Sequence, residues 1–234
     1  MVGMRGGRNV NEIIVVGLGG VGSALVEPLA RYMEHNKWSC SKLHLVDGDI
    51  YESNNLERQR ATEAELRKNK AEVHAARLKA LFKGITVIAT PKYISELNVS
   101  EIVGDNSAVF SCVDNHKTRK ILQDRCSRLK EVILISGGNE YHDGNVQVYV
   151  KRGGRELSPP ITKYHEEIAY PTDLSPEEMS CEELQESEPQ LLFTNLMVAC
   201  LMLNAFYGCV REVTPRYHEV YFDILENCAR PSKR

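Results

Sequence analysis

The sequence predicts a single α/β domain with a Rossmann-like, mostly parallel sheet, flanking helices and an antiparallel extension near its carboxyl terminus. Three observations predict this fold. The 234 residues, 42% of them hydrophobic, are enough for one sizeable core. Apolar runs rich in β-branched residues alternate with helical stretches, as in β-α-β units with parallel strands. From about residue 145 the chain instead alternates polar and apolar residues, which is typical of an antiparallel strand.

The parallel part is expected to contain five strands. Ile13-Ile14-Val15-Val16 reads as a strand buried on both faces, and a helix over 23–33 follows it. Thr62 and Glu65 fit a capping box that opens a helix carrying Leu66 to Leu81, with room for a break near Asn69. The other elements expected here are strands at 43–46, 85–89, 108–112 and 132–136 and a helix at 115–129.

The second part is expected to begin with an antiparallel strand at 145–150. A long crossing loop over about 152–188 follows, rich in proline and acidic residues. Loops of this length in compact domains often act as lids or binding loops. The chain then returns to a helix from Pro189 to Tyr207, with proline suited to its first turn, and to a last strand at 217–224.

Composition excludes several classes of function. The net charge is -3, whereas a nucleic-acid-binding protein would usually be clearly basic. The longest apolar run, 191–207, is interrupted by polar residues, and no signal peptide is evident, so we expect no membrane span and a cytoplasmic protein. The seven cysteines include no Cys-x-x-Cys pair, which predicts neither a disulfide framework nor zinc. Most are expected to be reduced and buried core residues.

A glycine-rich loop, Gly17-Leu18-Gly19-Gly20-Val21-Gly22-Ser23, joins the first strand to the first helix. Gly17 permits a tight turn, Gly19 permits close approach of a phosphate, and Gly22 permits helix–strand packing. The helix start offers N–H donors and partial positive charge to an anion. Asp47, after the second strand, is placed to bind a ribose. Alone, this pattern favours NAD over ATP, and glycines that serve only a turn are the structural alternative.

Three charged residues change that preference. Arg58 offers a rigid fork of donors for phosphate oxygens, and Lys70 offers a compact charge. Asp114 follows the fourth strand, where parallel sheets bind ligands, and can hold Mg²⁺ against phosphates. Each residue alone reads as an ordinary surface charge. Together with the glycine loop they indicate a triphosphate.

These motifs resemble those of the ThiF/MoeB/HesA superfamily, the ubiquitin-activating-enzyme-like adenylating fold, from about residue 12 to 225. The resemblance rests on the glycine loop at 17–23, Asp47, Asn55-Leu56-x-Arg58-Gln59, Lys70-Ala71 and Asp114-Asn115. It implies ATP and Mg²⁺ as cofactors, with the metal on Asp114. The nucleotide site that we assign comprises Gly17, Gly19, Gly20, Gly22, Asp47, Asp49, Asn55, Arg58, Gln59, Lys70, Asp114 and Asn115.

The resemblance also implies a reaction. Members of the family activate a carboxylate, typically the C-terminal glycine of a ubiquitin-like or sulfur-carrier protein, which attacks the α-phosphorus of ATP and displaces pyrophosphate. Both reactants are anionic, so the enzyme must supply positive charge and alignment. Arg58, Lys70 and a metal at Asp114 would do so. No catalytic base is required, since the carboxylate is already a nucleophile.

Cys181 resembles the family's cysteine that lies before the penultimate helix and can accept the acyl group as a thioester. Its neighbours Glu178, Glu182 and Glu183 argue against this role, because nearby negative charge raises a thiol pKa. A catalytic and an unreactive Cys181 therefore both stay open. Arg5 and Arg8 are the two residues available as an N-terminal arginine that reaches a partner's ATP.

Alternative functions differ in what they require. The chain could adenylate a small-molecule, peptide or tRNA-bound carboxylate, although its balanced charge counts against tRNA. A non-catalytic half of a heterodimeric activator would usually lack Arg58, Lys70 or Asp114. A nicotinamide-dependent oxidoreductase has no evident use for Arg58 and Lys70. A homodimer is the default expectation from the family; the apolar helix over 191–206 could contribute, but core packing is favoured for it.

Overall fold

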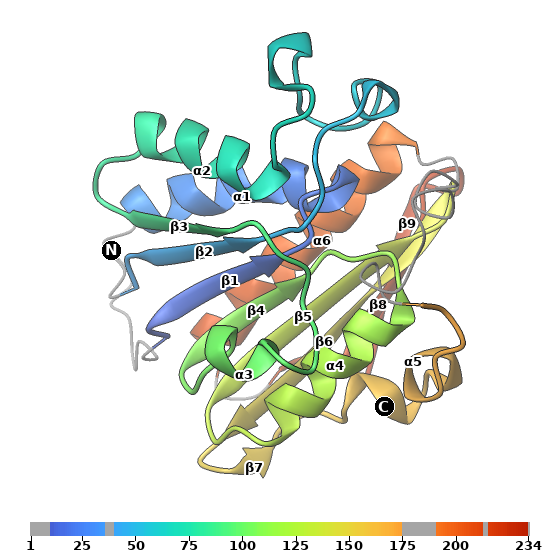
Figure 1. Cartoon of the computed structure of the whole chain (residues 1–234). Helices are drawn as coiled ribbons and strands as arrows, with labels where there is room; N and C mark the ends of the chain where they lie inside the picture. The colour runs from blue at the N-terminus through green and yellow to red at the C-terminus, as the bar shows by residue number, and fades with distance from the viewer. Residues whose placement is uncertain (1–9, 36–39, 175–190, 213–214, 234) are drawn as a thin grey trace.

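The structure is a computed structural model that describes residues 10–35, 40–174, 191–212 and 215–233. In these ranges one mixed sheet runs through the molecule, with strand order β3-β2-β1-β4-β5-β6-β8-β9 and β7 paired to β6 (Figure 1). Its strands are β1 (Glu12–Val16), β2 (Lys42–Val46), β3 (Thr86–Thr90), β4 (Ser107–Ser111), β5 (Val132–Asn139), β6 (Asp143–Arg152), β7 (Arg155–Glu156), β8 (Glu219–Asp223) and β9 (Cys228–Ser232).

Strands β1 to β5 pair in parallel, and every later pairing is antiparallel. The predicted α/β fold with an antiparallel extension is therefore confirmed. Strand β1 lies between β2 and β4, so the chain reverses direction across the sheet at this point. Ligands of open α/β sheets bind outside the carboxyl ends of the strands at such a reversal.

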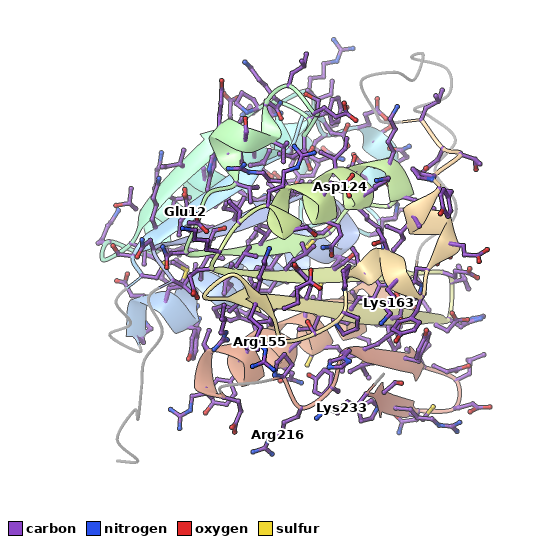
Figure 2. All side chains as sticks on the ribbon, turned by 90° about the horizontal axis from the view of Figure 1, so that it is seen from below. Glu12, Asp124, Arg155, Lys163, Arg216 and Lys233 are labelled. Atoms are coloured by element: carbon purple, nitrogen blue, oxygen red, sulfur yellow. The ribbon has the colours of Figure 1, made fainter. Side chains whose placement is uncertain are left out.

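Helices cover both faces of the sheet (Figure 1). The helices α1 (Gly20–His35), α2 (Lys70–Leu81) and α6 (Leu192–Arg211) pack over one face, and α3 (Val99–Ile102), α4 (His116–Ser127) and α5 (Glu166–Ala169) pack over the other. In β1, Ile13 and Val15 join the first core while Ile14 and Val16 join the second. Burial on both faces explains the continuous apolar run in the sequence. Charged side chains such as Arg216 and Lys233 project outward from the edge of the molecule (Figure 2).

The helix expected to open at Thr62 begins later. The Thr62–Glu65 capping box is present, but it opens only the short 3₁₀ turn η2 (Glu63–Glu65). Leu66 then becomes extended and Arg67 adopts a positive φ of 66°, which no helix continues through. Helix α2 starts at Lys70, where the Asn69 side chain accepts a hydrogen bond from the backbone N–H of Glu72 at 3.1 Å. The expected break near Asn69 is thus the true helix start.

Two further expectations need correction. Strand β9 was not predicted, because Arg230 and Pro231 give this exposed edge strand no apolar alternation. Proline is tolerated at an edge, where its missing N–H faces no partner. Cys200 is exposed on α6, and Cys112 and Cys228 are half-buried, so the description of these cysteines as core residues is wrong for Cys200. The buried free cysteines among the described residues are Cys40, Cys126 and Cys209.

The described part of the crossing loop, up to residue 174, contains β7, the 3₁₀ turn η3 (Ile161–Lys163) and α5. Pro189 and Cys181 lie outside the described residues. Helix α6 ends at Arg211, beyond the expected Tyr207. By length and composition alone it could cross a bilayer, and within the described ranges it is the one helix that could. In the structure it packs instead against α1, β5 and β6.

Candidate active site

The glycine loop lies at the carboxyl edge of the sheet, between β1 and the start of α1. Gly17 has a φ of 87°, and a Cβ there would approach the backbone oxygen of Cys112 to 2.8 Å. Its N–H donates to the oxygen of Val46 at 2.9 Å. Only glycine meets both demands, because L-residues rarely adopt this φ and the end of β4 leaves no space. The turn thus brings the ends of β1, β2 and β4 together.

The loop also depends on α6. A Cβ on Gly20 would lie 2.1 Å from the Nδ2 atom of Asn195, and one on Gly22 would lie 1.9 Å from the oxygen of Gly17. Asn195 is fully buried, and its two amide atoms have no hydrogen-bond partner within the described residues. At Gly19, in contrast, the nearest atom is the Nε2 of Gln59 at 3.9 Å. The loop is therefore closed toward α6 and open at Gly19.

Asp47 fastens the loop after β2 to the glycine loop. Its Oδ2 accepts a hydrogen bond from the N–H of Leu18 at 2.5 Å, and its Oδ1 accepts one from the N–H of Asp49 at 2.8 Å. Burial raises the pKa of Asp47 to about 6, the nearby Asp49 carboxylate adds to the rise, and Lys70 opposes it. Each carboxylate oxygen has a second lone pair, so ribose hydroxyls could still bind.

Lys70 reaches the same edge from the first turn of α2. Its side chain is buried, and its Nζ lies 2.9 Å from Oδ2 of Asp49. The hydroxyl of Tyr93 donates to the other oxygen of Asp49. Tyr93 was not among the predicted site residues. Its signal was its position just after the third strand, whose carboxyl end shares the edge with those of β1 and β2.

The Asn55-Leu56-Glu57-Arg58-Gln59 segment lies beside the glycine loop. Asn55 is buried, and its Oδ1 accepts a hydrogen bond from the N–H of Glu52 at 3.1 Å, which shapes the 3₁₀ turn η1 (Ser53–Asn55). Gln59 is buried next to Gly19, and its Oε1 has no hydrogen-bond partner within the described residues. Arg58 is half-buried between them, and its backbone N–H donates to the oxygen of Asn55 at 3.2 Å. The turn therefore places Gln59 beside the glycine loop, and Arg58 precedes it in the chain.

Asp114 follows β4 and is exposed. The next residue, Asn115, is the N-cap of α4, and its Oδ1 accepts from the N–H of Thr118 at 2.8 Å. Beneath them, Arg119 is buried, and its Nη2 donates to the oxygens of Val113 and Gly137 at 2.9 and 3.0 Å. Burial lowers the pKa of Arg119, while Asp114 acts in the opposite direction. Arg119 was not among the predicted site residues, although Asp114-Asn115 precedes it by one helical turn.

The chemistry of the site suits Mg²⁺ bound through a nucleotide. Among the described residues no group of three or more His, Cys, Asp or Glu side chains could hold a metal by itself. Mg²⁺, however, is commonly bound by one or two carboxylates together with substrate phosphates. Asp114, which follows β4 at the carboxyl edge of the sheet, fits that role. Arg5, Arg8 and Cys181 lie outside the described residues.

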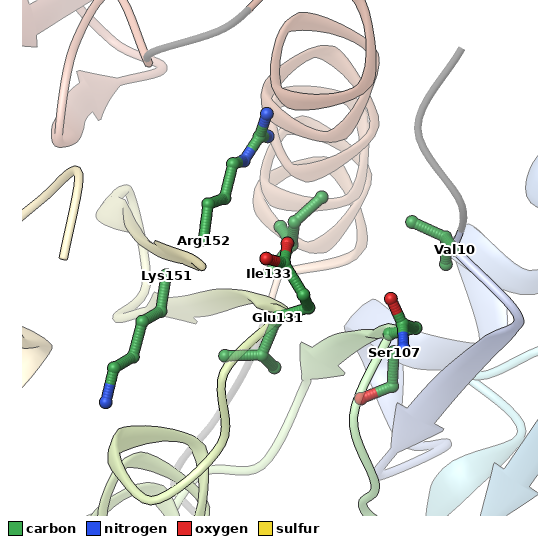
Figure 3. Close-up of a pocket in the computed structure, with 8 residues that line it drawn as sticks. Val10, Ser107, Glu131, Ile133, Lys151 and Arg152 are labelled. Carbon is green, nitrogen blue, oxygen red and sulfur yellow. The ribbon is translucent and has the colours of Figure 1, made fainter. Parts of the chain in front are cut away.

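A small cavity of about 200 Å³ lies at the other edge of the sheet, lined by Ser107, Glu131, Ile133 and Lys151 among others (Figure 3). These residues belong to the amino-terminal ends of β4 and β5 and to the end of β6, which runs antiparallel to β5. The cavity is therefore remote from the glycine loop. We place the chemistry at the carboxyl edge, where the polar and charged side chains converge.

Comparison with known proteins gives consistent results. Residues 6–224 match the family model described as the ThiF family. The mouse protein "Adenylyltransferase and sulfurtransferase MOCS3" is 34% identical over 143 residues, 61% of this chain and 30% of the relative. The "SAMP-activating enzyme E1" of Haloferax volcanii is 29% identical over 144 residues, 61% of this chain and 51% of the relative. The chain thus spans about a third to a half of these relatives.

Solved structures show the same fold. The structure of Escherichia coli MccB with ATP superposes with a TM-score of 0.72 at 17% identity, covering 96% of this chain and 64% of that one. The structure of PaaA superposes with a TM-score of 0.69 at 16% identity, covering 95% of this chain and 63% of that one. At these identities the likeness concerns the fold.

Proposed function

Because the chain belongs to the ThiF family, we propose that it is an ATP-dependent adenylyltransferase that activates a carboxylate. The observation that carries the proposal is the buried ammonium of Lys70 at the edge where Asp47 meets the glycine loop. A dinucleotide oxidoreductase needs no such cation beside its ribose carboxylate. A triphosphate does, because its oxygens carry charge that must be neutralised.

The proposed reaction joins two anions. An oxygen of the substrate carboxylate attacks the α-phosphorus of ATP, the bond from that phosphorus to the bridging oxygen breaks, and pyrophosphate leaves with the electron pair. Arg58 and Lys70 neutralise the phosphate oxygens, the α1 amino terminus offers N–H donors, and Asp47 orients the ribose. Mg²⁺ held by Asp114 would neutralise further charge. Alignment and charge neutralisation supply the rate gain, since no proton is transferred.

The substrate that we propose is the C-terminal glycine of a ubiquitin-like or sulfur-carrier protein. The names of the mouse and Haloferax relatives support this choice. Peptide, small-molecule and tRNA-bound carboxylates are the alternatives, and solved MccB structures include complexes with MccA. A non-catalytic half of an activator is disfavoured because Arg58, Lys70 and Asp114 are all retained. The acyl group would then pass to Cys181 or to an external sulfur donor.

We also propose a cytoplasmic homodimer. Several large apolar side chains are exposed along the outer face of α6, and burying them against a second copy would remove apolar surface from water. These residues are Leu192, Phe193, Leu196 and Tyr207. No nucleic acid, membrane or zinc is part of this proposal.

The decisive assay is carrier-dependent exchange of labelled pyrophosphate into ATP. Arg58→Ala, Lys70→Ala and Asp114→Ala should each lower exchange on the order of 10²-fold, since each removes a group that stabilises charge. Lys120→Ala is the matched control, because it removes a cation whose ion-pair partner is Asp124 of the same helix, α4. Unchanged exchange in all three variants would refute the proposal. Cys181→Ala should abolish acyl transfer but not exchange if Cys181 forms a thioester.

A further inference from the structure

Asp49 is held on every side that the structure describes. Its Oδ2 lies 2.9 Å from Nζ of Lys70, and its Oδ1 accepts a hydrogen bond from the hydroxyl of Tyr93. The Tyr93 ring packs against the loop, since a Cβ on Gly48 would lie 2.6 Å from two of its ring carbons. Both oxygens of this carboxylate are therefore aimed by named partners.

The backbone of Asp49 adds to this fixation. Its oxygen accepts hydrogen bonds from the N–H of Lys70 at 2.9 Å and from Nδ2 of Asn69 at 3.0 Å. Its N–H donates to Asp47 at 2.8 Å. Asp49 thus connects Asp47, the carboxylate that we assign to the ribose, with Lys70, the cation that we assign to the phosphates.

The Lys70 side chain is buried while the carboxylate of Asp49 is partly exposed. A buried ammonium without a counter-ion is costly, so Asp49 satisfies Lys70 before a nucleotide arrives. The same carboxylate repels an incoming triphosphate. The Asp49 carboxylate therefore weakens ATP binding. The benefit that we infer for it is that it aims the ammonium of Lys70. Lysine is a flexible side chain, and a fixed partner restricts its positions.

From this geometry we propose that Asp49 and Tyr93 are positioning residues: Tyr93 fixes the Asp49 carboxylate, and Asp49 holds the ammonium of Lys70 where it meets the phosphates. This inference rests on the proposed function and adds residues to the same site. Tyr93 contacts neither reactant in this scheme. It acts through Asp49 and Lys70.

The test measures ATP affinity by calorimetry and the maximal rate of pyrophosphate exchange with saturating ATP. Asp49→Asn should bind ATP at least as tightly as the wild type, because a repulsive charge is removed, yet exchange about 10-fold more slowly. Tyr93→Phe should slow exchange about 3-fold with unchanged affinity. Tyr149→Phe is the matched control, since it removes a tyrosine–carboxylate hydrogen bond, to Glu156, near the opposite edge of the sheet.

The coupling to Lys70 separates positioning from a general structural effect. In a Lys70→Met background, Asp49→Asn and Tyr93→Phe should slow exchange no further, because the group that they position is gone. Equal slowing in both backgrounds, or weaker ATP binding with an unchanged rate, would overturn the inference. An unfolded Asp49→Asn variant would leave Tyr93→Phe to decide it. Absence of ATP binding by the wild type would instead refute the proposed function.

A pH profile gives an independent readout. Asp49 is one cause of the raised pKa of Asp47, after burial. Asp49→Asn should therefore move the acid limb of ATP binding to lower pH, whereas Tyr149→Phe should leave it in place. An unmoved limb in Asp49→Asn would contradict the charge coupling on which the inference depends.

Discussion

The Nε2 atom of His165 lies 2.7 Å from Oε1 of Glu219, and its Nδ1 atom lies 2.9 Å from Oε1 of Glu167. Glu219 is buried on β8. His165 is the N-cap of α5, and Glu167 lies in the first turn of that helix. The hydrogen bond to Glu219 raises the pKa of His165 in spite of its burial. The imidazole of His165 thus connects the crossing loop, in the part that the structure describes, to strand β8.

We expect the contacts of His165 with Glu219 and Glu167 to make the stability of the protein depend on pH. The pKa of His165 is higher in the folded than in the unfolded protein, so its stabilisation is complete below about pH 6.5 and is lost as the pH rises through the folded value. His165→Gln should lower the free energy of unfolding by about 1–3 kcal/mol at pH 6, and less at pH 9. Urea unfolding at both pH values tests this. Glu167→Gln, which alters only the more exposed partner, should have the smaller effect.

His74 should act in the opposite sense. Its Nε2 lies 2.7 Å from the hydroxyl of Tyr51, and burial lowers its pKa to about 4. A folded pKa below the unfolded value of about 6.5 means that stability is lost as the pH falls from 6.5 towards 4. His74→Gln should flatten this acid limb of the unfolding curve. His35→Gln, at the exposed end of α1, should not. An unaltered acid limb in His74→Gln would show that folding does not lower the pKa of His74.

The contact between Gly20 and Asn195 predicts a rescue. Gly20→Ala places a methyl group against the Asn195 amide, and such overpacking typically costs about 1–3 kcal/mol. Asn195→Ala in the same chain should recover much of that loss, since the colliding amide is removed. Gly208→Ala on α6 meets no atom within 4 Å and should be neutral or stabilising, because alanine favours helix. Thermal unfolding of Gly20→Ala, Asn195→Ala, their double variant and Gly208→Ala measures the coupling; additive losses in the double variant would exclude a direct contact.

Arg119 should be essential to the shape of the site. Its guanidinium bonds two backbone oxygens, those of Val113 and Gly137, at the ends of β4 and β5. Arg119→Met keeps the length of the side chain but leaves both buried oxygens without this donor, which should cost about 1–3 kcal/mol. Exchange activity should fall with it, because Val113 adjoins Asp114. Arg216→Met, on an exposed side chain, is the control.

The sequence predicted best what local pattern determines. The β1 run Ile13 to Val16 and the glycine loop are contiguous, so period and composition identify both. Helix α2 was placed wrongly at its start because Thr62 and Asn69 are both good caps, and the positive φ of Arg67 decides between them. The local sequence does not determine which of the two caps begins the helix.

The site residues that we predicted lie within motifs, and their roles stay predictions. Asp47, Arg58, Lys70 and Asp114 stand at characteristic spacings. The contributions of Tyr93 and Asn195 depend on which elements the fold brings beside the loop, and no spacing in the sequence encodes that. The structure also gives Asn115 a role that its motif does not predict, because its Oδ1 atom caps α4.

The contact of Gly20 with Asn195 also bears on how the chain folds. The two residues are far apart in the sequence. During synthesis the glycine loop therefore leaves the ribosome before α6 has been made. Contacts between distant segments form late, because closing a long loop costs entropy. We therefore expect the loop to reach its final shape only once α6 has docked. A nascent or truncated chain without α6 would carry the complete glycine motif and still lack a finished phosphate cradle.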